Sequence, residues 1–176
     1  IITDKTGTLT QNIMSVNTVV LPDERVVSIT GSTWEPVGEF SENGKKIHPQ
    51  KDPILTALLE MNGMNDQADV VKSEKGGYEH IGDPTEASRV VLSRKGGFSE
   101  RKLNKKYDLL ESIPYDQKTK YRQNVIQEKK SKKKFLTVVG GAEKVMARCN
   151  KGLFVDGIKP LSPKQQKKFQ SIINQY

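Results

Sequence analysis

The sequence predicts an α+β fold in which helices flank a mainly antiparallel, twisted sheet. Short runs rich in Val, Ile, Tyr and Phe gather in the middle of the chain and follow one another as hairpins. Asp52-Pro53 and Asp83-Pro84 each precede an apolar stretch with helical spacing, as an N-cap followed by a first-turn proline does. With 176 residues, 34% of them hydrophobic and 28% charged, the chain is long enough for one domain with a buried core.

The strands are predicted from β-branched and aromatic runs bounded by turn residues. An extended connector over residues 11–20 comes first, and residues 31–44 form a turn-rich segment because they contain Pro36, Gly38 and Gly44. The strands themselves are expected at residues 25–30, 69–71, 77–81, 109–114, 121–127 and 135–139.

The helices are predicted from their caps and from the spacing of apolar residues. The first begins after Asp52 and buries one stripe of Ile54, Leu55, Leu58, Leu59 and Met61. The last follows Ser162-Pro163 and places Phe169, Ile172 and Ile173 on one face. The helices are expected at residues 52–62, 83–93, 99–107 and 142–148, and from residue 162 onward.

The chain is basic, with a formal net charge of +8. Much of this charge lies in three lysine-rich segments, residues 102–106, 129–134 and 164–168. Such segments can bind nucleic acid or anionic lipid, but solvated turns and helix faces are the favoured interpretation. Aromatic residues are only 6% of the chain and are not interleaved with the lysines, which argues against binding of single-stranded nucleic acid.

The first ten residues, Ile-Ile-Thr-Asp-Lys-Thr-Gly-Thr-Leu-Thr, form the most informative motif of the chain. An apolar run that ends on Asp4 is typical of a buried parallel strand that delivers a reactive carboxylate to its C-terminal edge. The hydroxyls, the exposed N–H groups and the glycine of Thr6-Gly7-Thr8 can hold a phosphate. A carboxylate in this setting can attack phosphorus and become an aspartyl phosphate.

The run Asp-Lys-Thr-Gly-Thr-Leu-Thr at residues 4–10 resembles the phosphorylation motif of P-type ATPases, the ion pumps that pass through an aspartyl phosphate. The resemblance implies that Asp4 is the nucleophile towards the γ-phosphoryl group of ATP and that Lys5 stabilises the developing charge. It also implies that Thr8 binds a phosphoryl oxygen and that Asp4 and the Thr6 carbonyl bind Mg²⁺. Residues 28–39 and 77–86 are similar to stretches of type II pumps of the sarcoplasmic-reticulum calcium ATPase kind.

Two alternative functions stay open beside the pump. Haloacid-dehalogenase-type phosphatases share the family fold but usually carry a second Asp two residues after the nucleophile, where this chain has Thr6. Without that acid/base an aspartyl phosphate should hydrolyse slowly, which suits a pump better than a soluble phosphatase. A basic nucleic-acid-binding or docking module is the other alternative.

The resemblance covers nearly the whole chain and implies that an ATP-binding domain follows the motif. Tyr115 would stack on adenine and Lys120 would lie near the charged part of the nucleotide. Glu86 would accept a hydrogen bond from the adenine amino group, with Thr85 beside it. The residues implied for ATP binding are Thr85, Glu86, Tyr115, Lys120, Gly140 and Gly141.

One position departs from the family pattern. The family has Lys-Gly-Ala-Pro-Glu before a helix, and the match here is Val139-Gly140-Gly141-Ala142-Glu143, so that Val139 replaces a lysine. Valine supplies neither a charge nor a donor. Either Lys144 or Lys120 compensates, or ATP binds weakly, or the adenosine is bound in another way. Gly140 and Gly141 still allow the backbone to approach a ligand closely.

The resemblance also predicts the organisation of the protein. Residues 1–12 would be the strand and loop of a phosphorylation domain, residues 13–24 a hinge, and residues 25–176 the nucleotide-binding domain. Because the chain starts inside a motif and lacks the later phosphorylation-domain motifs, we expect a fragment that is inactive alone. It would be a cytoplasmic domain of an integral membrane protein. Its partners would be ATP and the phosphorylation, actuator and transmembrane domains of the pump, with no nucleic acid and no membrane insertion of its own.

Overall fold

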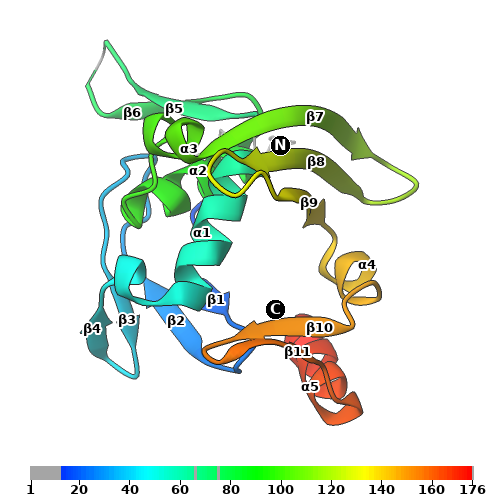
Figure 1. Cartoon of the computed structure of the whole chain (residues 1–176). Helices are drawn as coiled ribbons and strands as arrows, with labels where there is room; N and C mark the ends of the chain where they lie inside the picture. Colours follow the sequence, from blue (N-terminus) through cyan, green and yellow to red (C-terminus); the bar gives the residue numbers. More distant parts are fainter. Residues whose placement is uncertain (1–12, 66, 75, 176) are drawn as a thin grey trace, which may run out of the picture. The chain divides into compact units, whose positions relative to one another are not determined.

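The computed structural model describes residues 13–65, 67–74 and 76–175. The chain divides into two compact units, whose elements are labelled in Figure 1. Unit 1 contains the chain up to Leu21 together with Arg25–Glu100. Unit 2 contains Pro22–Glu24 and the chain from Arg101 onward. Each unit is an α+β structure with its own sheets.

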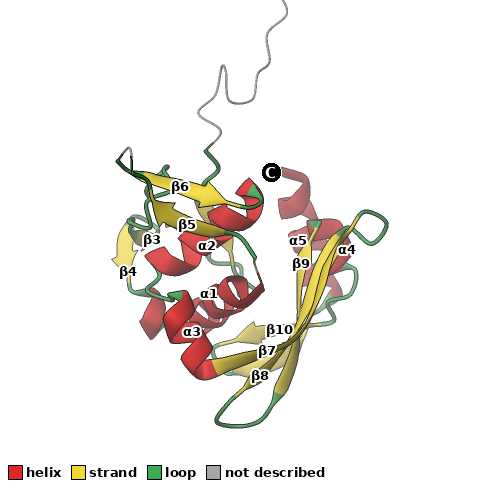
Figure 2. Cartoon of the chain, turned by 90° about the horizontal axis from the view of Figure 1, so that it is seen from above, coloured by secondary structure: helices red, strands yellow, loops and turns green. Residues whose placement is uncertain are grey.

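Unit 1 combines a four-stranded antiparallel sheet, a separate hairpin and two helices. The sheet has the order β1-β2-β3-β4, and β5 pairs with β6. The elements are β1 (Thr18–Val20), β2 (Val26–Ile29), β3 (Phe40–Glu42), β4 (Lys45–Ile47), the 3₁₀ turn η1 (Pro49–Lys51), α1 (Pro53–Asn65), β5 (Asp69–Lys72), β6 (Tyr78–Ile81) and α2 (Pro84–Lys95). Figure 2 shows α2 between the β5–β6 hairpin and α1.

The two Asp-Pro pairs cap the helices of unit 1 as the sequence predicts. Asp52 Oδ1 accepts hydrogen bonds from the N–H groups of Ile54 and Leu55, each at 3.0 Å. Asp83 Oδ1 caps α2 in the same way, at 2.8 and 3.0 Å from the first two free N–H groups. Behind these caps, the helices bury apolar side chains completely, including Leu55, Leu59 and Ala87.

Unit 2 is built around a three-stranded antiparallel sheet of order β7-β8-β9. A second hairpin, β10–β11, follows, and α4 packs on both β9 and α5. The elements are α3 (Glu100–Lys106, whose first residue belongs to unit 1), β7 (Tyr107–Asp116), β8 (Tyr121–Glu128), β9 (Lys134–Gly140), α4 (Ala142–Met146), β10 (Lys151–Phe154), β11 (Gly157–Pro160) and α5 (Pro163–Gln175).

The predicted α+β class and the antiparallel pairing are confirmed, but the strands form four sheets and not one. Two hairpins, β3–β4 and β10–β11, are absent from the prediction. The predicted phosphorylation-domain strand at residues 1–12 lies outside the described residues, and the predicted division at residues 12 and 24 stays a prediction. Among the described residues, no helix has the length and apolarity needed to cross a membrane.

Candidate functional site

Four of the predicted ATP-binding residues meet at one end of the three-stranded sheet in unit 2. Asp116 at the end of β7 pairs with Tyr121 at the start of β8, and Tyr121 pairs with Gly140 at the end of β9. Tyr115, Lys120, Gly140 and Gly141 therefore lie around the β7–β8 turn. We call this group the turn site. It places an exposed aromatic ring at the end of β7 and an exposed lysine in the turn that follows.

Lys120 is held in the turn site by its own backbone. Its φ is +63°, in the left-handed region that is uncommon for non-glycine residues. Its N–H donates to the Asp116 carbonyl at 2.8 Å, and its carbonyl accepts from the N–H of Gly141 at 2.8 Å. A Cβ on Gly140 would lie 2.2 Å from the Lys120 carbonyl oxygen, so only glycine allows this approach. The glycine pair thus positions the lysine.

Asp116 fixes the other side of the same turn. Its Oδ1 accepts hydrogen bonds from the N–H groups of Thr119 at 2.8 Å and Lys118 at 3.0 Å. The hydrogen bond from the Thr119 N–H, more than any other contact, lowers the pKa of the Asp116 carboxyl below its usual value. The turn that carries Lys120 is therefore fixed by both backbone and side-chain hydrogen bonds.

Tyr115 lies at a β-bulge, and the bulge determines which β8 residue lies opposite it. Ile113 pairs with Gln123 and Asp116 pairs with Tyr121, so two β7 residues, Pro114 and Tyr115, face the single β8 residue Arg122. The Tyr115 side chain is 53% exposed, enough for a flat ligand to stack on its ring.

Arg122 is a residue of this site that the sequence analysis missed. On its other side it pairs with Val139 of β9, and directly opposed residues share one face of an antiparallel sheet. Arg122 therefore lies directly across from the position where the resemblance implies a lysine. Arg122 is only 3% exposed, although arginine is almost never fully buried unless it is paired. The sequence places Arg122, Asn124 and Ile126 on one face of the strand, but this pattern does not tell whether the arginine is buried or faces the solvent.

A strip of buried and half-buried polar side chains accompanies Arg122 on that face. Its Nη2 donates a long hydrogen bond of 3.4 Å to Ser112 Oγ, which donates to Asn124 Oδ1 at 2.8 Å. Thr137 Oγ1 donates to the Asn124 carbonyl at 3.2 Å. A polar strip inside a sheet is costly unless its groups are satisfied, and these internal hydrogen bonds supply partners to Ser112, Asn124 and Thr137.

Thr85 and Glu86, the other predicted ATP ligands, belong to unit 1 and lie in the first turn of α2. Glu86 Oε2 accepts a hydrogen bond from the Gln67 N–H at 3.0 Å, and the Thr85 hydroxyl donates to Met14 Sδ at 3.7 Å. The Thr85 side chain is exposed and Glu86 is half-buried, so a polar ligand can reach both.

The predicted catalytic and magnesium-binding residues, Asp4, Lys5, Thr6 and Thr8, lie outside the described residues. Within the described ranges, no cluster of three or more His, Cys, Asp or Glu side chains could hold a metal ion.

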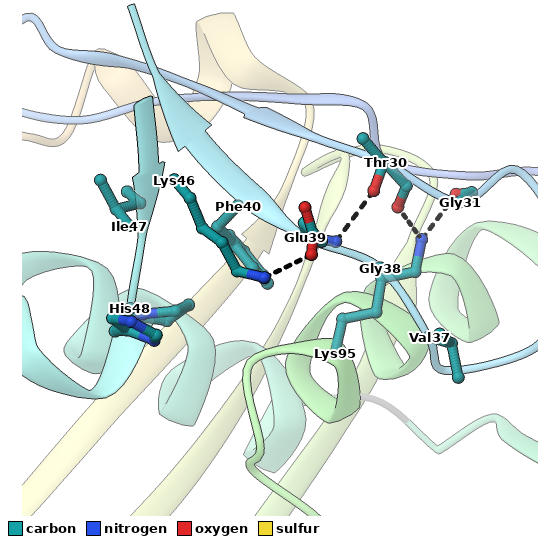
Figure 3. Close-up of a pocket in the computed structure, with 11 residues that line it drawn as sticks. Thr30, Gly31, Val37, Gly38, Glu39, Phe40, Lys46, Ile47, His48 and Lys95 are labelled. Carbon is teal, nitrogen blue, oxygen red and sulfur yellow. Dashed lines mark hydrogen bonds and ion pairs between the residues drawn. The ribbon is translucent and has the colours of Figure 1, made fainter. Parts of the chain in front are cut away.

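Unit 1 also contains a pocket of about 470 Å³ that the sequence did not indicate (Figure 3). Lys95, from the end of α2, donates to the Thr30 carbonyl at 2.8 Å and to the Gly31 carbonyl at 2.6 Å. Burial lowers the pKa of the Lys95 ammonium below its usual value. Lys46 pairs with Glu39, and both side chains line the pocket. Lys95 thus attaches the loop after β2 to α2, and this structural role is enough to explain why a lysine lies in the pocket.

The comparisons with known proteins define a class that agrees with this architecture. The family described as P-type ATPase, cytoplasmic domain N, matches residues 54–176. The match covers well over half of the chain, and the chain therefore belongs to this family.

Individual relatives indicate which P-type ATPases the chain is similar to. The chain is 32% identical to a "Calcium-transporting ATPase" of Bacillus subtilis over 95% of its own length, and 30% identical to "Calcium-transporting ATPase 1" of Lactococcus lactis over 97%. It is 28% identical to "Cation-transporting ATPase pma1" of Synechocystis over 88%. The chain spans only 17–18% of the length of these relatives. It is thus similar to one domain of P-type, calcium-pump-like ATPases.

Proposed function

We propose that this chain binds ATP as the nucleotide-binding domain of a P-type cation pump of the calcium-transporting type. The observation that carries the proposal is the turn site, in which Gly140 and Gly141 hold the Lys120 backbone in the turn after the strand that carries the exposed Tyr115 ring. The family membership and the names of the calcium-transporting relatives support the same function. Thr85 and Glu86 stay predicted adenine contacts on the strength of the resemblance.

In this proposal, each residue of the turn site has a distinct task. The Tyr115 ring stacks on adenine, because an aromatic face binds a flat base with little loss of conformational entropy. The Lys120 ammonium lies near the phosphates, where its charge opposes theirs. Gly140 and Gly141 keep the Lys120 backbone in place, so that the lysine is ready to bind before the ligand arrives.

We further propose that Arg122 supplies the positive charge that Val139 does not. Both residues lie on one face of the sheet, directly opposite each other. A buried guanidinium is already stripped of much of its water, so a hydrogen bond from it to the nucleotide is stronger than one made in solvent. Arg122 is therefore a third candidate for the missing charge, beside Lys120 and Lys144, whose side chains are exposed.

The parent pump would use the bound ATP to phosphorylate Asp4 and so drive cation transport across a membrane. Lys5 and Thr8 would stabilise the transferred phosphoryl group, and Asp4 with the Thr6 carbonyl would hold Mg²⁺. The chain alone should be inactive, because phosphoryl transfer needs several charged groups around the transition state. Radiolabelled ATP should therefore yield no acid-stable phosphoenzyme from these 176 residues.

A nucleotide titration followed by amide chemical shifts tests the binding proposal. ATP should shift the amides of Tyr115, Lys120, Gly140 and Gly141. Amides of the β10–β11 hairpin serve as the internal control. If millimolar ATP left the turn site unshifted while the protein was folded, the proposed binding function would be wrong.

A charge exchange between two strands tests the role of Arg122. Arg122→Met should weaken ATP binding by about 1.5–3 kcal/mol, the value of a hydrogen bond to a charged group. The double variant Arg122→Met/Val139→Lys moves the cation across the strand pair and should recover most of the loss. Val139→Lys alone places two cations opposite each other and should not strengthen binding. An Arg122→Met protein that is folded and binds ATP normally would rule out this role.

A further inference from the structure

Four lysines from two separate segments line one open pocket in unit 2. The pocket has a volume of about 470 Å³ and is lined by Lys105, Lys106, Lys129 and Lys130. The first two lie in the last turn of α3, and the other two lie in the turn between β8 and β9. The fold therefore brings together two basic segments that are more than twenty residues apart in the sequence. We call this the lysine pocket.

The lysine pocket is held together by specific hydrogen bonds. Lys129 Nζ donates to the Asn104 carbonyl of α3 at 2.6 Å and lies 3.1 Å from a carboxylate oxygen of Asp108. The Lys129 N–H donates to the Lys106 carbonyl at 2.9 Å. These contacts fix the β8–β9 turn against the end of α3, and Figure 1 shows this turn beside α3. The pocket is thus formed before any ligand binds.

The surroundings of the pocket are strongly positive. Residues 101–108 and 128–134 contain nine of the 29 Lys and Arg residues of the chain and two of its 21 Asp and Glu residues. Both acids already have partners, since Asp108 pairs with Lys129 and Glu128 accepts from the Ser131 hydroxyl. The exposed side chains of Lys105 and Lys130 have no ion pair with another described residue.

Like charges that converge on a concave surface repel one another and create a strong local potential. A multivalent anion relieves this repulsion, and several ammonium groups can bind its oxygens at once. We propose that the lysine pocket binds a compact polyphosphate, either free in solution or as the head group of an anionic lipid.

The lysine pocket is separate from the proposed ATP site. It lies where β7 begins and β8 ends, because Tyr107 pairs with Glu128, whereas Tyr115 and Lys120 lie at the other end of these strands. The ten residues of β7 span roughly 30 Å at about 3.3 Å per residue. One small ligand therefore cannot occupy both places. The inference goes beyond the proposed function and does not depend on it.

The test is a titration of the whole chain with inorganic tripolyphosphate, followed by amide shifts. Amides of residues 104–107 and 128–132 should shift, and salt should weaken the binding. Lys105→Ala/Lys130→Ala should weaken it about fivefold to tenfold. Lys164→Ala/Lys167→Ala on α5 removes the same charge from exposed positions elsewhere and should leave the affinity nearly unchanged.

Vesicles distinguish the two sources of phosphate. Phosphatidylcholine vesicles with and without cardiolipin are sedimented with the protein and with both double variants. Binding to cardiolipin that only Lys105→Ala/Lys130→Ala weakens assigns the pocket to a lipid head group, and tripolyphosphate binding without vesicle binding assigns it to a free anion.

Three results would overturn the proposal. The first is that tripolyphosphate does not shift the pocket amides. The second is that the two double variants lose affinity equally, as expected for unspecific attraction to net charge. The third is that single-stranded DNA binds the same amides more tightly than tripolyphosphate, which would make the surface a nucleic-acid site. Amides of Tyr115 and Gly140 report ATP binding in the same samples, so failure of one proposal is distinguishable from failure of the other.

Discussion

Gly140→Ala gives the most direct test of how the turn site is built. The added Cβ would lie 2.2 Å from the Lys120 carbonyl oxygen and 2.4 Å from the Tyr121 Cβ. Both distances are far below van der Waals contact, and both neighbours are backbone or next to it. The end of β9 must therefore move away from the β7–β8 turn. This movement breaks the hydrogen bond between the Gly141 N–H and the Lys120 carbonyl.

The size of the effect follows from the steric overlap and from the lost hydrogen bond. Overpacking against a fixed backbone costs about 1–3 kcal/mol, and a lost hydrogen bond costs about 1 kcal/mol. Gly140 has no positive φ, so alanine adds no backbone strain of its own. We expect Gly140→Ala to lower the free energy of unfolding of unit 2 by about 2–4 kcal/mol.

Gly141→Ala is the matched control, because the same methyl group is added one residue later. Its Cβ would lie 3.7 Å from the Lys120 carbonyl oxygen, which is ordinary contact. Urea unfolding of both variants, followed by circular dichroism, measures the difference. ATP titration should then show weaker binding for Gly140→Ala and little change for Gly141→Ala. Equal stability of the two variants would refute the argument that Gly140 is needed for the approach to Lys120.

Two further predictions concern unit 1. Asp52 caps α1 and pairs with Arg25 at 2.5 Å. Burial opposes the ionised form of Asp52 and by itself would raise its pKa. The Arg25 guanidinium and the helix N–H groups together outweigh burial, so the pKa of the Asp52 carboxyl lies below the usual 3.8. Its charge therefore stabilises the fold fully at pH values well above 3.8 and loses this effect as pH falls through the lowered pKa. Asp52→Asn should thus cost about 1–2 kcal/mol at pH 7 and less at pH 3 in urea unfolding. A deficit that stays constant between these two pH values would contradict the charge argument. Lys95→Met removes two hydrogen bonds to main-chain carbonyls and should speed amide exchange at Val37 in the attached loop. Lys46→Met, which removes an exposed side chain that lines the same pocket, should not. Equal exchange in both variants would show that Lys95 does not hold the loop.

Local signals in the sequence predicted the helices of unit 1 well. Asp52 and Asp83 cap helices because a short carboxylate followed by proline leaves few other conformations. The strands around Tyr115 and Lys120 were also found, because their apolar and aromatic residues have the periodicity of a sheet.

The missed hairpins had a signal of another kind. β3 and β4 are joined by Asn43-Gly44, with φ of +49° and +76°. β10 and β11 are joined by Val155-Asp156, and the next residue, Gly157 at the start of β11, has a φ of +113°. Asn-Gly and Asp-Gly are the dipeptides that tight hairpins favour. The flanking strands are short and rich in lysine, so their hydrophobic pattern was too weak to show them.

The proposed role of Arg122 could not be predicted from the sequence, because it depends on register. Only the bulge at Tyr115 and the pairing with Val139 place the guanidinium across from the position of the family lysine. A shift of one residue would turn the arginine to the opposite face. The sequence therefore predicts the strand, but it does not predict that the strand buries Arg122.

The strand order of the four sheets has a consequence for how the protein folds. Each described strand pairs only with strands that come directly before or after it in the sequence. Such pairings close short loops, cost little chain entropy and form quickly, within about 1–10 μs for an isolated hairpin. Low contact order of this kind favours fast folding. Each sheet can therefore form from residues already synthesised, in the order in which they leave the ribosome.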